Sequence, residues 1–142
     1  MRWTDPALKT ALCSLLLFIL GGCATTAEKP GATVPGIEID GVEIVNELGY
    51  QVTDVMILVP RTGAFVGCGT VLGGTSCSTS FPGRAYQQNA VQVTWKELGQ
   101  PYTTGDFNIS LPADLQSSHQ FWIKVVIFAP GQAGAKLEKN RK

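Results

Sequence analysis

The 142-residue chain carries little charge, and its positive and negative side chains are equal in number. Asp, Glu, Lys and Arg make up 15% of the residues, against about 25% in an average globular protein. The 11 basic residues balance the 11 acidic ones. Because such a chain has no general field that attracts polyanions, we expect no nucleic-acid partner.

Histidine is nearly absent, since His119 is the only one. It stands in LQSSHQF, beside Ser117 and Ser118, in a stretch typical of an exposed loop. A catalytic serine meets its base across the fold, and the chain has no GxSxG motif. The phosphate-binding patterns GxGxxG and GxxxxGK[ST] are missing too, although GCGTVLGG is rich in glycine. We predict no catalytic residues, no cofactor and no enzyme activity.

Long apolar runs are also scarce, and the single clear one lies near the start. Arg2 and Lys9 precede the apolar run ALCSLLLFIL at positions 11–20, and Gly21 and Gly22 follow it. These are the three parts of an export signal. The run is only half of the roughly 20 residues that a membrane-spanning helix needs, so we expect no permanent span.

The tetrapeptide that ends this run, Leu20-Gly21-Gly22-Cys23, resembles the lipobox of bacterial lipoproteins. In that family the cysteine sulfur receives a diacylglyceryl group, signal peptidase II cleaves before the cysteine, and many Gram-negative species acylate the new amino terminus. The resemblance implies that residues 1–22 are a signal peptide, that Cys23 is the lipidated first residue, and that the lipoprotein-processing enzymes are partners. The alternative is an ordinary secretory signal with a chance cysteine.

Two or three acyl chains on Cys23 suffice as a membrane anchor, because each buried methylene contributes about 0.8 kcal/mol and one chain alone holds only marginally. Ala24 stands where the family's inner-membrane retention signal has aspartate, which favours the outer membrane, facing the periplasm. Residues 23–35 show no apolar period and predict a flexible tether, which reaches about 40 Å when extended.

Of the four cysteines, only Cys68 and Cys77 remain available for a disulfide. Cys13 lies within the signal, and Cys23 is assigned to the lipid. The periplasm is oxidising, and the remaining pair stands in GCGTVLGGTSCS without a CxxC motif or a nearby third metal ligand. We therefore predict no metal site, and a structural disulfide across a β-hairpin. Loop entropy gives it about 2.7 kcal/mol for a ten-residue ring.

Beyond Gly36, short apolar runs alternate with turns, and no stretch of ten or more residues has a convincing helical period. Alternation is clearest in NAVQVTWKELG, where Val91, Val93 and Trp95 share one face. TGDFNISLP repeats the pattern, and QFWIKVVIFAP, apolar on both faces, is typical of a central strand. The expected turns are PRTG at 60–63, PG at 82–83 and LGQP at 98–101.

These strands, about seven over residues 36–130, predict an all-β domain with the architecture of an antiparallel two-sheet sandwich. The pattern looks like an immunoglobulin or fibronectin type III domain, although the Cys-Trp-Cys spacing of true immunoglobulin domains is missing. A small closed β-barrel is the alternative. We predict that residues 131–142 (GQAGAKLEKNRK) are a basic, polar and frayed tail.

Acidic residues are concentrated near the start of this domain: Glu38, Asp40, Glu43, Glu47 and Asp54. Paired carboxylates bind calcium or serve as acid and base, but no EF-hand-like spacing is present. We interpret these residues as solvated carboxylates, which also protect strand edges from pairing with another chain.

Aromatic side chains offer the best prospect of a binding surface. Trp122 shares a strand face with Lys124, which indicates that part of this face meets solvent. Trp122, Lys124 and Trp95 are therefore candidate binding residues, together with Tyr50, Tyr86 and Tyr102; the alternative places the tryptophans in the core. Two functions follow: a non-catalytic module for binding an envelope protein or supporting an assembly, or a carbohydrate or cell-wall binding module.

Overall fold

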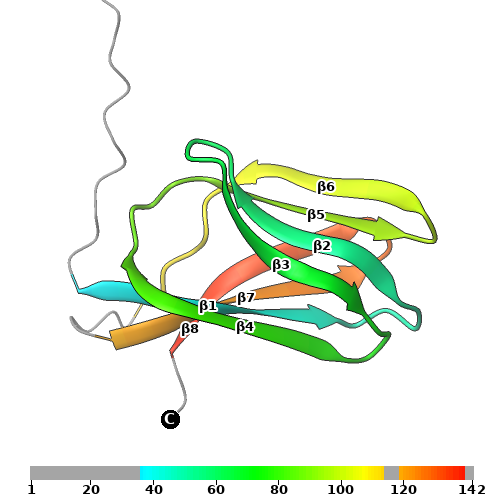
Figure 1. Cartoon of the computed structure of the whole chain (residues 1–142), viewed down its shortest axis with the longest axis horizontal. Helices are drawn as coiled ribbons and strands as arrows, with labels where there is room; N and C mark the ends of the chain where they lie inside the picture. Colours follow the sequence, from blue (N-terminus) through cyan, green and yellow to red (C-terminus); the bar gives the residue numbers. More distant parts are fainter. Residues whose placement is uncertain (1–35, 114–118, 140–142) are drawn as a thin grey trace, which may run out of the picture.

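The computed structural model describes residues 36–113 and 119–139, and these residues form eight strands in two layers (Figure 1). Sheet A has the strand order β4-β1-β7-β8 and sheet B the order β3-β2-β5-β6. The strands of sheet A are β1 (Ile37–Asn46), β4 (Ser76–Ala85), β7 (His119–Ala129) and β8 (Gln132–Lys139). The strands of sheet B are β2 (Val52–Val59), β3 (Ala64–Val71), β5 (Val91–Glu97) and β6 (Gln100–Phe107).

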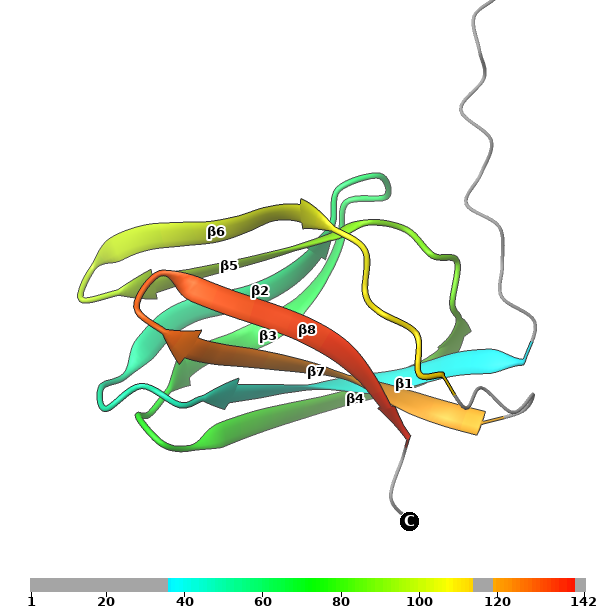
Figure 2. The same ribbon diagram turned by 180° about the vertical axis from the view of Figure 1, so that it is seen from behind.

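The two sheets keep open edges, so the predicted two-sheet sandwich is confirmed and the closed-barrel alternative is wrong. Neighbouring strands are antiparallel except β1 and β7, which run parallel. The pairs β2–β3, β5–β6 and β7–β8 are hairpins, and the views from the front and from behind show the last two in opposite layers (Figures 1 and 2). The described residues contain no helix that is long and apolar enough to cross a bilayer.

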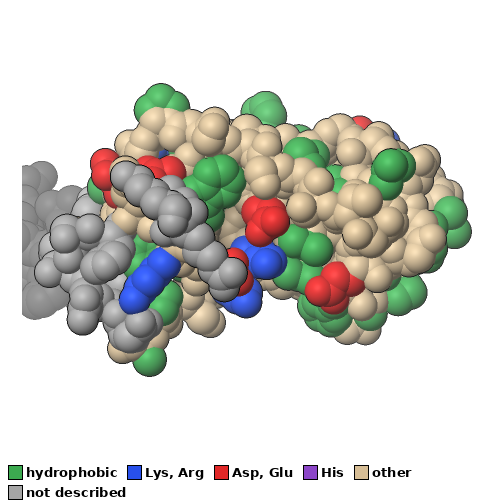
Figure 3. Space-filling model, turned by 90° about the horizontal axis from the view of Figure 1, so that it is seen from below, with side chains coloured by type: hydrophobic (Ala, Val, Ile, Leu, Met, Phe, Trp, Pro, Cys, Tyr) green, Lys and Arg blue, Asp and Glu red, His purple; other side chains and the backbone are tan. Residues whose placement is uncertain are grey.

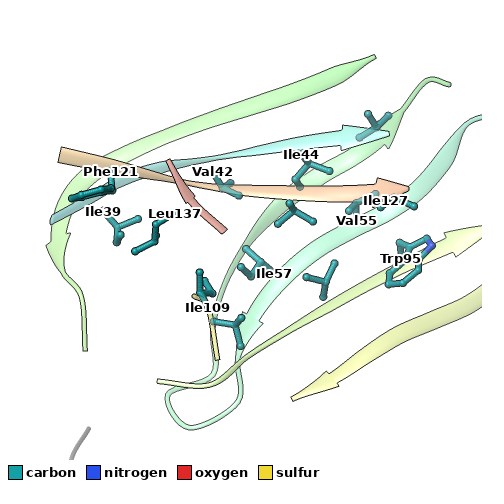
Figure 4. Packing of buried hydrophobic residues seen from close by; sticks show 14 of the residues in the cluster. Ile39, Val42, Ile44, Val55, Ile57, Trp95, Ile109, Phe121, Ile127 and Leu137 are labelled. Atoms are coloured by element: carbon teal, nitrogen blue, oxygen red, sulfur yellow. The ribbon is translucent and has the colours of Figure 1, made fainter. Parts of the chain in front are cut away.

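The core consists of alternate residues from both sheets, which point into the space between the layers (Figure 4). Val91, Val93 and Trp95 are all buried, so the predicted inward face of β5 is confirmed. Phe121 and Val125 are fully buried on β7, which lies between β1 and β8 as the central strand that the sequence predicts. Removing a side chain of this size from water contributes about 1.5–3 kcal/mol, so this interface is the main source of stability.

The predicted hairpin around the cysteines is wrong, because β3 and β4 belong to different sheets. The turn between them is fixed to the end of β1: Gly74 N donates to Asn46 O and Asn46 N donates to Thr75 O, each at 2.9 Å. The chain therefore crosses from one layer to the other at this turn. Alternation alone does not distinguish such a crossing from a hairpin, since both give two strands joined by a short glycine turn.

The predicted turn at Pro82-Gly83 is wrong, because both residues lie inside a strand. The predicted LGQP turn is confirmed at Leu98 and Gly99, but it is shorter than predicted, because Gln100 and Pro101 already belong to a strand. Pro82 and Gly83 are part of β4, and Pro101 is the second residue of β6. Both strands are at sheet edges, where one side of the backbone has no partner strand and a missing N–H is tolerated. β6 consequently begins earlier than TGDFNISLP suggests and ends at Phe107, and Ser110 makes only an isolated bridge to Lys136.

Residues 132–139 of the predicted frayed tail instead form β8, an edge strand paired with β7. Leu137 is buried, and Ala133 and Ala135 pack against the same core. Two alanines give a weak apolar period, which is why the polar composition of this segment was misleading. Its charged residues lie on an edge strand, where they oppose pairing with another chain.

Candidate functional site

The first half of β3 and the second half of β4 diverge at one end of the sandwich (Figure 1). An open groove lies between these two edge strands. We call it the β3–β4 groove. Its volume is about 910 Å³, comparable with the ~300–1,000 Å³ of pockets that bind small ligands. Its apolar lining comes from both sheets and from the segment after β6: Ile39, Ile57, Val59, Phe65, Val66, Phe81, Val91, Ile109 and Ile123.

Phe65 is the most exposed large apolar side chain at this groove, with 71% of its surface accessible. It alternates with Ala64 and Val66 along β3 and also lines a second hollow on the outer face of sheet B, so it lies at the rim of the groove. Ile39, Ile57 and Val91 form the floor of the groove and are almost completely buried. The apolar surface that an occupant can cover comes from the partly buried side chains of the lining, which are Val59, Val66, Phe81 and Ile123. Burying apolar surface contributes about 25 cal/mol per Å², so an apolar occupant of the β3–β4 groove gains affinity from these side chains.

Arg84 is the single charged residue among those that line the β3–β4 groove. Its side chain is exposed, and it forms no ion pair with another described residue. Thr62, Thr79, Gln87 and Asn89 supply uncharged polar groups. The groove therefore offers one unneutralised cation beside an apolar floor, a combination that favours an occupant with both an acidic and an apolar part.

The position of Arg84 results from a bulge in the pairing of β4 with β1. Ile39 pairs with Arg84 and Gly41 pairs with Ser80, so residues 81–83 lie opposite Asp40 alone. Extra residues in one strand re-aim the side chains beyond them. After the bulge, Arg84 is paired with the inward-facing Ile39 and lines the groove.

The opposite lip of the groove is the PRTG turn between β2 and β3, which the sequence predicts correctly. Thr62 N and Gly63 N both donate to Val59 O, at 3.1 and 2.9 Å. Gly63 has φ +70°, a conformation that residues with a Cβ rarely adopt. Behind the groove, buried Tyr86 donates from its hydroxyl to Ile109 O at 3.4 Å, and burial raises the pKa of this phenol.

Trp95, one of the candidate binding residues, belongs to the core, since only 2% of its surface is accessible. Its Nε1 donates to the Glu97 carboxylate at 2.7 Å, and Tyr102 stacks on its ring with centroids 5.9 Å apart. Trp95 therefore has no free face for a sugar. Figure 4 shows it among core side chains, far along the sandwich from Phe121.

Glu97 is a buried polar residue that the sequence analysis missed. It accepts hydrogen bonds from the Tyr50 hydroxyl and from Gly131 N, each at 2.9 Å, in addition to the Trp95 bond. Burial raises the pKa of the Glu97 carboxyl, but the three hydrogen-bond donors together lower it by more than burial raises it. The pKa of Glu97 therefore lies below its ordinary value. The available indication was its parity, since Glu97 continues the inward series of Val91, Val93 and Trp95.

Trp122 and Lys124 lie on the outer face of sheet A and not at the β3–β4 groove. Lys124 Nζ lies 3.6 Å from carboxylate oxygens of both Glu43 and Glu138. In the view from below, basic and acidic side chains gather next to one another on this side (Figure 3). Trp122 is half-buried, and its Nε1 is buried without a hydrogen-bond partner among the described residues.

The predicted disulfide between Cys68 and Cys77 is confirmed, with Cα atoms 6.5 Å apart. His119 starts β7 opposite Ile37, so its backbone lies in a strand and the loop expected there is wrong. Cys23, Ser117 and Ser118 lie outside the described residues. Of the predicted acidic group, Asp54 pairs with Lys96 at 2.9 Å, and no three His, Cys, Asp or Glu side chains in the described ranges converge as metal ligands do.

A second hollow, of about 890 Å³, lies on the outer face of sheet B. Its lining includes Met56, Thr94 and Thr103, together with both partners of the Asp54–Lys96 ion pair. It shares Phe65 with the β3–β4 groove, but its lining contains two charged residues, Asp54 and Lys96, where the groove has Arg84 alone.

No protein-family model, curated protein or solved structure matches this chain. The function is therefore inferred from the sequence motif and from the geometry of the groove.

Proposed function

We propose that this protein is a lipid-anchored, non-catalytic binding protein of the bacterial cell envelope, and that its sandwich holds a partner protein in the β3–β4 groove. The observation that carries the binding part is the groove itself: a lining of partly buried apolar side chains that is open on one side, with Phe65 exposed at its rim. A soluble domain gains stability by covering such a surface, so its exposure favours a role in binding.

The anchoring part is supported by the Leu20-Gly21-Gly22-Cys23 motif and by the tether-like composition of residues 23–35. We infer that Cys23 carries the acyl chains and that the sandwich faces the periplasm from the outer membrane. The Cys68–Cys77 disulfide agrees with this inference, because disulfides persist in oxidising compartments outside the cytoplasm.

Anchoring is tested by mass spectrometry and by fractionation of cells that express the wild type or a Cys23→Ser variant. We expect an acylated amino-terminal Cys23 in the wild type, which sediments with envelopes, and a Cys23→Ser chain that carries no acyl group and keeps residues 1–22, because acylation and cleavage both need the cysteine. If the Cys23→Ser chain is cleaved before residue 23 and still sediments completely with the envelopes, the lipid anchor is wrong.

Binding is tested by capturing the lipidated protein from detergent-solubilised membranes with two matched variants. Phe65→Asp places charge at the groove, whereas Leu98→Asp changes a side chain that is 82% exposed on the β5–β6 turn. We expect a reproducible partner that the wild type and Leu98→Asp retain and that Phe65→Asp loses. If no partner is reproducible, or if Phe65→Asp keeps it fully, the proposed use of the groove is overturned.

The carbohydrate-binding alternative has weaker support, because it needs exposed aromatic faces. Trp95 and Tyr86 are buried, and the Tyr50 hydroxyl is bonded to Glu97. Trp122, which is half-buried, and Tyr102, which stacks on Trp95, remain as candidates for stacking. Binding to purified cell-wall sacculi that Trp122→Ala abolishes and Phe65→Asp leaves intact would favour this alternative.

A further inference from the structure

The four edge strands of the sandwich are β3, β4, β6 and β8, and β3 differs from the others. Edge strands usually carry charged residues or proline, which prevent pairing with another chain. The other three edges have such residues: Pro82 and Arg84 in β4, Pro101 and Asp106 in β6, and Lys136, Glu138 and Lys139 in β8. β3, with the sequence AFVGCGTV, has neither charge nor proline.

The unprotected edge borders the β3–β4 groove. Ala64, Phe65 and Val66 of β3 line this groove, and β2 is the single strand with which β3 pairs in sheet B. An edge strand bonds to its neighbour on one side, so backbone N–H and C=O groups on its other side are unpaired. The apolar lining of the groove and the unpaired backbone groups of β3 are therefore next to each other.

We propose that an extended segment of the partner protein pairs with β3 as a fifth strand of sheet B and points alternate side chains into the β3–β4 groove; this mode rests on the function proposed above. Strand addition of this kind takes affinity from backbone hydrogen bonds and specificity from pockets for every second side chain. The segment has apolar residues at period two, because the lining that they contact is apolar.

Arg84 adds a charge requirement to this segment. It is the one cation among the lining residues, and no described carboxylate pairs with it. A guanidinium forms bidentate hydrogen bonds with a carboxylate. The bound segment therefore carries an aspartate or glutamate near the β4 wall.

The Cys68–Cys77 disulfide limits the length of the inserted part. It joins the two edges, so the groove is accessible alongside Ala64, Phe65 and Val66 and closed at Cys68. A strand paired with these three residues places one or two side chains on the inner face. An anionic acyl chain also satisfies Arg84 and the apolar floor, but it leaves the backbone groups of β3 unused; the peptide accounts for both observations.

A random dodecapeptide library displayed on phage, selected against the purified full chain with its disulfide oxidised, tests the proposal. We expect enriched peptides with alternating apolar residues and an acidic residue at a constant offset. Synthetic versions then bind the wild type in fluorescence anisotropy. Ala64→Lys and Val66→Lys, which introduce the charge that β3 lacks, weaken binding at least tenfold.

Thr103→Lys is the matched control, because it adds the same charge to an exposed position of β6, the opposite edge of the same sheet. It leaves binding unchanged. Circular dichroism and thermal melts check that each variant folds, and Ala64 is exposed, so Ala64→Lys stays informative if Val66→Lys unfolds. For Arg84, selection against Arg84→Lys retains the acidic residue, and selection against Arg84→Glu replaces it with a basic one.

The proposal is overturned if no period-two pattern is enriched, or if enriched peptides bind Ala64→Lys as tightly as the wild type. Calorimetric titration with dodecanoate is a second test, which distinguishes a peptide strand from an acyl chain as the occupant of the groove. Saturable binding of dodecanoate that competes with every selected peptide and is insensitive to Ala64→Lys assigns the groove to an acyl chain and overturns strand addition. In either case, a partner captured from membranes and lost in Phe65→Asp leaves the proposed function intact.

Discussion

Cys68 of β3 and Cys77 of β4 face each other from opposite sheets, with their Cα atoms 6.5 Å apart. The disulfide joins two strand edges that share no backbone ladder. On one side of it the chain turns between the layers at residues 72–75, and on the other side lies the β3–β4 groove. The disulfide therefore holds the two layers together beside the groove, where fewer side chains cover the core.

Removing the disulfide lowers the stability of the sandwich. The bond closes a ring of ten residues, with a sequence separation of 9. Loop entropy for a ring of this size predicts that Cys68→Ser/Cys77→Ser lowers the free energy of unfolding by about 2.7 kcal/mol. Urea denaturation of the oxidised wild type and the double variant measures this difference. Equal midpoints and slopes would show that the bond adds no stability.

Glu97→Gln destabilises the protein although it preserves the size of the side chain. Three donors converge on the carboxylate, and the amide group places a donor where one oxygen accepted. We expect a loss of about 1–3 kcal/mol in chemical denaturation. Glu47→Gln, which makes the same change at an exposed position, is the control and stays within about 0.5 kcal/mol of the wild type.

The advantage of the wild type over Glu97→Gln depends on pH. The pKa of Glu97 in the folded protein lies below the ordinary value of 4.5 for a glutamate carboxyl. A carboxyl with a lowered pKa stabilises the fold above its unfolded pKa, and this contribution is lost as the pH falls through the folded pKa. The stability difference between the two proteins is therefore full at pH 6–7 and shrinks below about pH 4.5. A difference that grows on acidification contradicts the assignment.

Gly67→Ala destabilises β3, whereas Gly69→Ala in the same strand does not. A Cβ at Gly67 collides with the carbonyl oxygen of Val55 and lies 2.8 Å from Met56 Cα, and both neighbours are backbone atoms of β2. At Gly69 nothing lies within 4 Å of an added Cβ. We expect Gly67→Ala to lose about 1–3 kcal/mol in thermal or urea unfolding. Similar stability of the two variants would show that β2 and β3 approach less closely.

Trp95 reports its burial through fluorescence. In a Trp3→Phe/Trp122→Phe variant Trp95 is the single tryptophan, and only 2% of its surface is accessible. We expect blue-shifted emission that iodide does not quench, because the quencher cannot reach a core side chain. The reciprocal variant with Trp122 alone, which is half-buried, is quenched more strongly. Equal quenching of both tryptophans is the contrary result.

The inward and outward faces of most strands were predictable from the sequence, because side chains alternate along a strand whatever its partners are. The Val91, Val93 and Trp95 series shows this, and so does the pairing of Cys68 with Cys77 once the other two cysteines are assigned elsewhere. The N-terminal motif ending at Cys23 is equally local, and the lipid anchor that it indicates stays a prediction. Glu97 also lies on the inward face of β5, but because it is polar, its burial was not predicted from the sequence.

The placement of strands into layers was decided only by the tertiary structure. Whether residues 72–75 close a hairpin or carry the chain between sheets depends on their hydrogen bonds to Asn46, which is distant in sequence. The same holds for Arg84, whose place in the groove follows from a bulge opposite β1, and for Leu137, which turns a polar segment into β8. Alternation depends only on neighbouring residues and can be read from the sequence. Strand pairing depends on which distant segments bury their apolar faces against one another, and this is decided only when the core forms.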